Sequence, residues 1–241
     1  MKVIVFGATG MVGQGALREC LLDERVGAVL TVGRSPVGRS PVGNSAVGNS
    51  ALGSGAAGTT HTKLRDLVTS DLTDLSDHLS EFAGYDACLF CLGVSSAGMS
   101  AADYTRITYD LTLSVANTLA EITPDMTFCY VSGAGTDSSE QGRIRWARVK
   151  GRTENALLAL PFRAYMFRPG FIQPLHGIVS KTPLYRAVYR LTGPLLPLLS
   201  RAFPKIVTTT EDLGKAMLTV AATGWPTHIL ETTDICAAAT G

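Results

Sequence analysis

Three glycines near the start of the chain have the spacing of a phosphate-binding turn. Gly7, Gly10 and Gly13 directly follow the apolar run Lys2–Phe6 and open a helical pattern. Gly7 permits a sharp turn out of a strand, Gly10 leaves room for a pyrophosphate group, and Gly13 lets the helix pack closely on the sheet. Free N–H groups and the helix dipole then attract phosphate. We therefore expect a dinucleotide to contact Gly7, Thr9, Gly10, Met11, Val12 and Gly13.

The residue at the end of the second strand indicates which dinucleotide is bound. An acidic residue there would bind the ribose 2′-hydroxyl of NAD, whereas an arginine can pair with the 2′-phosphate of NADP. The apolar run Val29–Val32 ends in Gly33 and Arg34, with no acid. The sequence therefore favours NADP over NAD. Arg39, in the repeat that follows, is an alternative to Arg34.

The elements that must position this turn alternate in type along the first two-thirds of the chain. Apolar runs predict strands at Lys2–Phe6, Val29–Val32, Asp66–Thr69, Ala87–Leu92, Thr127–Val131 and Ala164–Phe167. Helical patterns lie between them at Met11–Leu22, Leu75–Phe82, Asp103–Glu121 and Ile144–Ala159. Strands that are apolar on nearly every residue are typical of a parallel sheet covered on both faces. The pattern predicts an α/β fold with a Rossmann-type doubly wound parallel sheet, in a single domain over residues 1–241.

Two segments interrupt this alternation. From Val32 the chain repeats the units VGRSP, VGRSP, VGNSA, VGNSA and LGSGA, whose small residues predict a flexible surface loop over residues 35–60. Residues 170–205 form a small substrate-side region, in which Leu184–Leu199 is rich in Leu, Tyr and Arg. This stretch is either a helical flap over the active site, which its prolines favour, or an amphipathic segment at a membrane surface.

Composition narrows the class of partner. Hydrophobic residues make up 46% of the chain, and the formal net charge is +1. These values argue against global disorder and against a basic surface for nucleic acid, so we expect a small-molecule substrate. Five scattered cysteines favour a reducing cytoplasm over a disulfide framework. Cys88 and Cys91 should point to opposite faces of one strand, which favours buried thiols over a metal site.

Later motifs resemble the atypical, extended type of the short-chain dehydrogenase/reductase superfamily. Tyr130–Ala134 is similar to its fifth strand, which ends in the active-site serine, and Arg168–Phe171 to its sixth-strand exit. Small NAD(P)-dependent epimerase/dehydratase-like proteins, including the group related to the Tat-interacting oxidoreductase-like protein, share these features and the segment Thr208–Gly214. The resemblance implies cofactor contacts at Asp71, Leu72, Cys91, Leu92, Gly93, Lys150, Pro169 and Phe171.

One position departs from this superfamily. Its members use a tyrosine that transfers the substrate proton and a lysine four residues later that binds the ribose and lowers the tyrosine pKa. Lys150 is present here, but Trp146 occupies the tyrosine position, and an indole N–H does not titrate usefully. The resemblance thus implies a modified catalytic set of Ser132, Lys150 and Trp146, with Ser132 bonding a substrate carbonyl. Tyr104 and Tyr109 are candidate substitutes for the missing phenol.

Two functions follow from these observations. The first is an NADP(H)-dependent oxidoreductase or epimerase-like enzyme that acts on a small molecule. The second is an NADPH-binding regulatory or scaffold protein with little turnover, because the proton relay is incomplete. Peripheral membrane contact through Leu184–Leu199 and pairing of subunits through the two long helices stay open.

Overall fold

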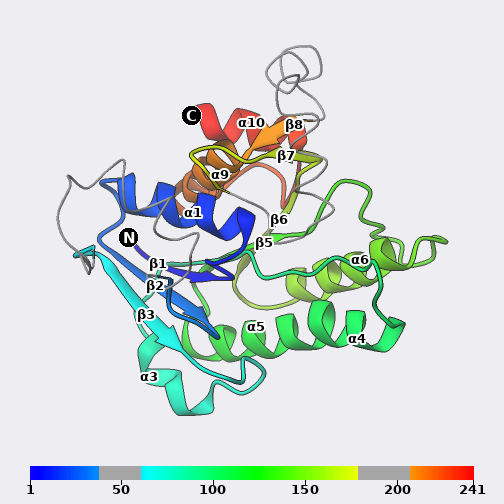
Figure 1. Ribbon diagram of the computed structural model, residues 1–241, viewed down its shortest axis with the longest axis horizontal. Helices are drawn as coiled ribbons and strands as arrows, with labels where there is room; N and C mark the ends of the chain where they lie inside the picture. Colours follow the sequence, from blue (N-terminus) through cyan, green and yellow to red (C-terminus); the bar gives the residue numbers. More distant parts are fainter. Residues whose placement is uncertain (38–60, 179–206) are drawn as a thin grey trace.

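The computed structural model describes residues 1–37, 61–178 and 207–241. Within these residues the chain forms a parallel seven-stranded sheet of order β3-β2-β1-β4-β5-β6-β9 (Figure 1). Its strands are β1 (Lys2–Phe6), β2 (Ala28–Gly33), β3 (Leu64–Val68), β4 (Ala87–Phe90), β5 (Thr127–Val131), β6 (Arg163–Arg168) and β9 (Ile229–Glu231). A smaller parallel sheet pairs β7 (Phe171–Gln173) with β8 (Val207–Thr209).

Helices cover both faces of the large sheet (Figure 1). One face carries α1 (Met11–Leu22), α9 (Thr210–Thr223) and α10 (Thr232–Thr240). The other carries η2 (Ser76–His78), α3 (Leu79–Phe82), α4 (Ala101–Thr105), the π-helical turn η3 (Arg106–Asp110), α5 (Leu111–Ile122) and α6 (Arg145–Leu158). Each face has its own hydrophobic core, because successive strand residues point to opposite sides. The predicted Rossmann-type doubly wound sheet is therefore confirmed.

The two cores explain why the strands are apolar throughout. In β1, Val3 and Val5 pack in the core beneath α1 and α9, whereas Ile4 and Phe6 pack in the core beneath α5. Cys88 lies in the second core and Cys91 packs against the first. The expectation that these two thiols point to opposite faces is therefore confirmed.

Most of the helices and strands predicted from the sequence occur in the structure at similar residue ranges. The bounds of β1, β5 and α1 agree with the sequence, and the long helix expected over Asp103–Glu121 is interrupted by η3. The expected helix over Leu75–Phe82 is divided into η2 and α3. Sequence reasoning did not identify β7, β8, α9, β9 and α10, which follow Pro169.

The repeat and the expected flap lie largely outside the described residues. Residues 38–60, and with them Arg39, are not described, and neither is Leu184–Leu199. Val37, which begins the second repeat unit, is described: it is 5% exposed, packs in the core beside α1, and donates its N–H to Oδ2 of Asp66 at 3.3 Å. The core therefore extends into the repeat. Within the described ranges, no helix is long and apolar enough to cross a membrane.

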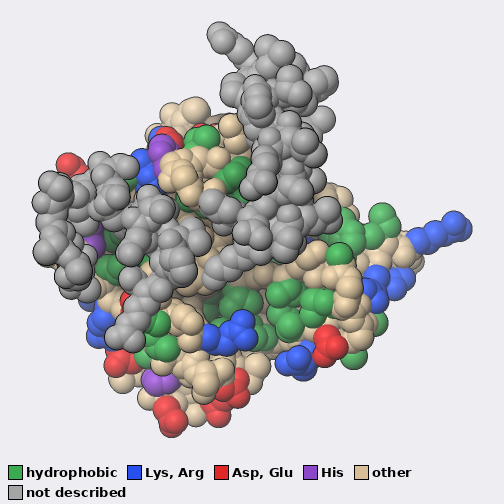
Figure 2. All heavy atoms as spheres, in the orientation of Figure 1, with side chains coloured by type: hydrophobic (Ala, Val, Ile, Leu, Met, Phe, Trp, Pro, Cys, Tyr) green, Lys and Arg blue, Asp and Glu red, His purple; other side chains and the backbone are tan. Residues whose placement is uncertain are grey.

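Charge is mixed on the surface that Figure 2 displays. Acidic and basic side chains are interspersed over the described part of this face, and apolar side chains lie between them. This agrees with the formal net charge of +1.

The order of the strands defines where a ligand can bind. The chain builds β1, β2 and β3 toward one edge and then returns to place β4 on the other side of β1. The loops that leave β1 and β4 therefore diverge, which opens a crevice at the carboxyl ends of these strands.

Helices α1 and α9 approach each other closely beside this crevice. A Cβ atom on Gly15 would lie 2.5 Å from the backbone oxygen of Thr210, and one on Gly214 would lie 2.8 Å from Cγ of Glu19. Glycine at both positions allows this contact. Consequently, α9 packs directly against α1 on this face of the sheet.

Candidate active site

A cavity of about 620 Å³ opens at the switch point between β1 and β4. Its wall is formed by the start of α1, the loop after β4, the end of β5, one face of α6 and the turn after β6. The expected site residues on this wall are Gly10, Met11, Val12, Cys91, Leu92, Gly93, Ser132, Trp146, Lys150 and Pro169. The fold therefore brings the glycine turn and the three expected catalytic residues into one cavity.

The glycine turn has the geometry of a phosphate cradle. Gly7 has φ of +77°, and a Cβ there would lie 2.7 Å from the backbone nitrogen of Leu92. A Cβ on Gly13 would lie 2.1 Å from the oxygen of Gly7. The first bond of α1 runs from N of Gln14 to O of Gly10 at 2.8 Å. The N–H groups of Met11, Val12 and Gly13 precede that bond, so they suit a pyrophosphate group.

Some expected cofactor contacts do not line the cavity. Arg34 is exposed at the end of β2, and Asp71 is exposed after β3. Leu72 is buried in the core beneath α5. On β7, Ile172 lines the cavity rather than Phe171. Gly7, Thr9 and Gly13 belong to the turn behind the wall.

Ser132 directly follows β5 and is held by two residues of α6. Its hydroxyl donates to Oε1 of Glu154 at 2.5 Å, with the backbone oxygen of Phe167 at 3.2 Å. Nζ of Lys150 donates to its backbone oxygen. Because an ionised carboxylate is an acceptor only, the hydroxyl proton is committed to Glu154. The expectation that Ser132 bonds a substrate carbonyl stays a prediction.

Glu154 is wholly buried, and Arg168 compensates its charge. Nε of Arg168 lies 3.1 and 3.2 Å from the two carboxylate oxygens, and Nη2 binds the second of them. The same guanidinium reaches Ser138 Oγ at 2.5 Å and Glu231 Oε1 at 3.3 Å. A buried carboxylate requires such pairing.

Sequence reasoning missed Glu154. The available signal was its spacing, because Trp146, Lys150 and Glu154 follow one another at intervals of four residues. In a helix this spacing places all three on one face.

Three titratable groups line the described wall of the cavity. Burial lowers the pKa of Lys150 to about 8, while the charge of Glu154 opposes this shift. Burial raises the pKa of Tyr104, and it raises that of Cys91 to about 12. Of these three, Lys150 therefore titrates closest to neutral pH. Tyr109 does not line the cavity; the guanidinium of Arg152 lies 4.0 Å from its ring centroid.

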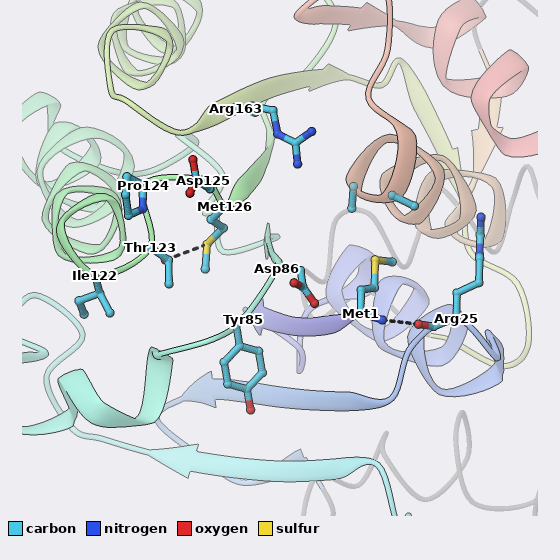
Figure 3. A pocket seen from close by; sticks show the side chains of 12 residues that line it. Met1, Arg25, Tyr85, Asp86, Ile122, Thr123, Pro124, Asp125, Met126 and Arg163 are labelled. Carbon is cyan, nitrogen blue, oxygen red and sulfur yellow. Dashed lines mark hydrogen bonds between the residues drawn. The ribbon is translucent and has the colours of Figure 1, made fainter.

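A larger hollow of about 750 Å³ lies at the amino ends of the strands (Figure 3). Asp86, on its wall, accepts the backbone N–H of Lys2 at 2.6 Å, and the amino group of Met1 donates to the oxygen of Arg25 at 2.5 Å. These polar groups serve the fold itself. Ligands in open α/β sheets bind at the carboxyl ends, so the smaller cavity is the candidate active site.

Comparison with known proteins identifies the fold. No protein-family model and no curated protein matches the sequence. Among solved structures, WbmF of Bordetella bronchiseptica, in complex with NAD+, aligns 76% of its chain with 99% of this one, at 17% identity and a TM-score of 0.64. DesIV of Streptomyces venezuelae, a dTDP-glucose 4,6-dehydratase with NAD and TYD bound, aligns 80% of its chain with 99% of this one, at 15% identity and a TM-score of 0.64.

A smaller enzyme aligns over nearly its whole length. An oxidoreductase of the short-chain dehydrogenase/reductase family from Burkholderia thailandensis aligns 92% of its chain with 97% of this one, at 16% identity and a TM-score of 0.64. At such identities the likeness concerns the fold. The chain has the Rossmann-type α/β fold of NAD-dependent dehydratases, epimerases and short-chain oxidoreductases.

Proposed function

We propose that the protein binds a nicotinamide dinucleotide in the cavity and transfers hydride to or from a small molecule, as an oxidoreductase or an epimerase-like enzyme. The observation that carries this proposal is that the phosphate cradle and the pair Ser132 and Lys150 share one cavity. The structures of WbmF and DesIV, which share the fold and contain NAD, support it. So does the resemblance of Arg168–Phe171 to the sixth-strand exit of extended short-chain enzymes.

The described residues suit the parts of such a cofactor. The N–H groups of Met11, Val12 and Gly13 would hold the pyrophosphate, and Lys150 would bind the nicotinamide ribose. When bound, the dinucleotide supplies or accepts a hydride. The apolar side chains of Val12, Leu92 and Ile172 on the wall would limit the access of water to the reacting atoms.

NADP is the proposed form of the cofactor. Arg34 is exposed at the carboxyl end of β2, the position from which a side chain can reach a 2′-phosphate. A guanidinium there would form charge-assisted hydrogen bonds with the phosphate. An aspartate at the same position would favour the 2′-hydroxyl of NAD.

Calorimetric titration with NADPH and NADH tests both parts of this proposal. Arg34→Asp should weaken NADPH binding by about 10- to 100-fold and favour NADH, because a hydrogen bond to a charged group contributes roughly 1.5–3 kcal/mol. Arg163→Asp is the matched control, since Arg163 is exposed at the opposite end of the sheet. Failure of the wild type to bind either nucleotide would overturn the proposed function, whereas an unaltered preference in Arg34→Asp would overturn only the choice of NADP.

A second candidate is an NADPH-binding regulatory or scaffold protein. The observation that favours it is the presence of Trp146 at the tyrosine position, beside a serine whose hydroxyl proton is bonded to Glu154. Tight NADPH binding without oxidation by quinones, aldehydes, ketones or sugar nucleotides would support this function. The variant Gly10→Asp places a carboxylate in the phosphate cradle. If this variant folds but no longer binds a cellular partner of the wild type, the partner binding depends on the nucleotide, as the regulatory function requires.

A further inference from the structure

The cavity carries Trp146 at the position where related enzymes have the tyrosine that donates a proton, so reduction there needs another donor. Reduction of a carbonyl group requires a proton at oxygen as hydride reaches carbon. The indole of Trp146 cannot release one at useful pH. Ser132 is also excluded in this arrangement, because its hydroxyl already donates to Glu154.

Lys150 has the position and the chemistry for this task. Its side chain lines the cavity, and its bond to the backbone oxygen of Ser132 uses one of the three N–H groups of an ammonium. Burial brings its pKa to about 8, near the range in which a general acid is effective. The other titratable wall groups, Cys91 and Tyr104, have pKa values raised by burial.

Glu154 faces both Ser132 and Lys150 from the next turn of α6. It accepts the Ser132 hydroxyl, and its negative charge favours the protonated form of Lys150 against the effect of burial. Arg168, from β6, holds this carboxylate in place. Among the described residues, the charged and titratable groups of this site besides Lys150 and Cys91 are Glu154 on α6, its partner Arg168 on β6, and Tyr104 of α4 on the same cavity wall.

We propose that Lys150 is the proton donor of the reaction and that Glu154 is a positioning residue, which fixes Ser132 and keeps the lysine charged. The proposal rests on the proposed hydride-transfer function. The substrate carbonyl carbon receives hydride from a reduced nicotinamide dinucleotide, and its oxygen receives the proton as one N–H bond of Lys150 breaks. The products are an alcohol, the oxidised dinucleotide and a neutral amine that regains its proton from water.

The first test requires no turnover. Acetylation of the folded protein with acetic anhydride across a pH series, read by peptide mass spectrometry, reports the titration of each lysine. Lys150 should become reactive near pH 8, whereas Lys215, whose pKa is raised by its bond to Glu211, should react only at higher pH. If Lys150 titrates with Lys215, the proposal is overturned.

Glu154→Gln tests the positioning residue in the same assay. Glutamine keeps an acceptor for Ser132 but removes the charge, so the Lys150 profile should move down by about one pH unit or more. Glu231→Gln is the control, because Glu231 contacts the same arginine from a half-exposed position. An unchanged profile in Glu154→Gln overturns the role of Glu154. If that variant does not fold, Glu154→Asp should give a downward shift as its shorter carboxylate withdraws.

The second test uses turnover. Lys150→Arg keeps the charge and the N–H donors, but a guanidinium does not release a proton. We expect kcat to fall by about 10²- to 10⁴-fold, with the Kd for NADPH changed only a few-fold, and Trp146→Tyr in the same chain to restore part of the rate. An unchanged kcat in Lys150→Arg overturns the donor role alone. Failure of the wild type to bind either NADPH or NADH overturns the proposed function. Nucleotide binding without reduction of any carbonyl compound overturns the role of Lys150 as proton donor and leaves the binding function intact.

Discussion

Arg168 and Glu154 form a buried ion pair that ties the end of β6 to the middle of α6. The side chain of Glu154 is 0% exposed and that of Arg168 is 10% exposed. The same carboxylate accepts the Ser132 hydroxyl, so this pair determines the position of a residue on the cavity wall. The geometry of the site therefore depends on two side chains behind that wall.

Replacing Arg168 should lower the stability of the protein strongly. Arg168→Met leaves Glu154 buried without its partner, and we expect the free energy of unfolding to fall by about 3–5 kcal/mol. Urea unfolding followed by circular dichroism measures this loss. Glu231→Gln removes the charge of the more exposed partner of Arg168 but keeps an acceptor for the start of α10, so it should lower stability by less than about 1 kcal/mol. If both variants lost the same free energy of unfolding, the buried pair of Arg168 and Glu154 would not be the more important of the two interactions.

Alanine substitutions at two glycines of the turn should have different effects, one mainly on stability and the other mainly on cofactor binding. A Cβ on Gly13 would lie 2.1 Å from the backbone of Gly7, so Gly13→Ala should lower stability by about 3 kcal/mol or more. A Cβ on Gly10 would lie 3.3 Å from the same oxygen, so Gly10→Ala should fold with a loss of about 1 kcal/mol. Its methyl group would narrow the cradle and weaken NADPH binding. Thermal melting and calorimetry together test this, and undiminished affinity in Gly10→Ala would contradict the cradle.

A tyrosine at position 146 should improve reduction. A phenol beside Lys150 can donate a proton, and general acid catalysis contributes about 10²- to 10⁴-fold, of which we expect Trp146→Tyr to recover at least a part. NADPH oxidation with a panel of carbonyl compounds measures the gain. Trp146→Phe is the matched control, because it supplies a ring of similar size without a hydroxyl. A comparable rate in both variants would show that the phenol lies out of reach of the substrate.

Acid should weaken the link between α9 and the turn after β7. Lys215 and His176 both bind the carboxylate of Glu211 at 2.6 Å and hold its pKa at about 2, below the ordinary value of 4.5. A lowered folded-state pKa contributes stability that is present above pH 4.5 and is lost as the pH falls toward 2. Glu211→Gln should therefore lower stability by about 1 kcal/mol at neutral pH and by nothing near pH 2. Denaturant unfolding at several pH values measures this difference, which should not persist in strong acid.

The sequence predicted the parts of the site that depend on local geometry. Gly7, Gly10 and Gly13 belong to one turn whose spacing alone indicates its conformation, and the apolar runs located six strands of the large sheet. Pairing of Lys150 with Ser132 followed from the family resemblance. These features could be predicted because they depend little on contacts with distant parts of the chain.

Other features depend on contacts that a linear pattern does not show. A glutamate on a helix usually faces solvent, and Glu154 becomes recognisable as buried only when β6 brings Arg168 beside it. Val37 belongs to a repeat of small residues, yet Asp66 on the neighbouring strand binds its N–H and the core encloses it. The covering of α1 by α9 likewise results from glycines in distant segments, whose role depends on their neighbours.

The close contact between α1 and α9 makes the phosphate-binding turn depend on a distant segment of the chain. The turn opens α1, and α1 meets α9 where Gly15 approaches Thr210 and Gly214 approaches Glu19. A larger side chain at either glycine would push the two helices apart. Under the proposed function, such a change in α9 should weaken nucleotide binding although no residue of α9 lines the cavity.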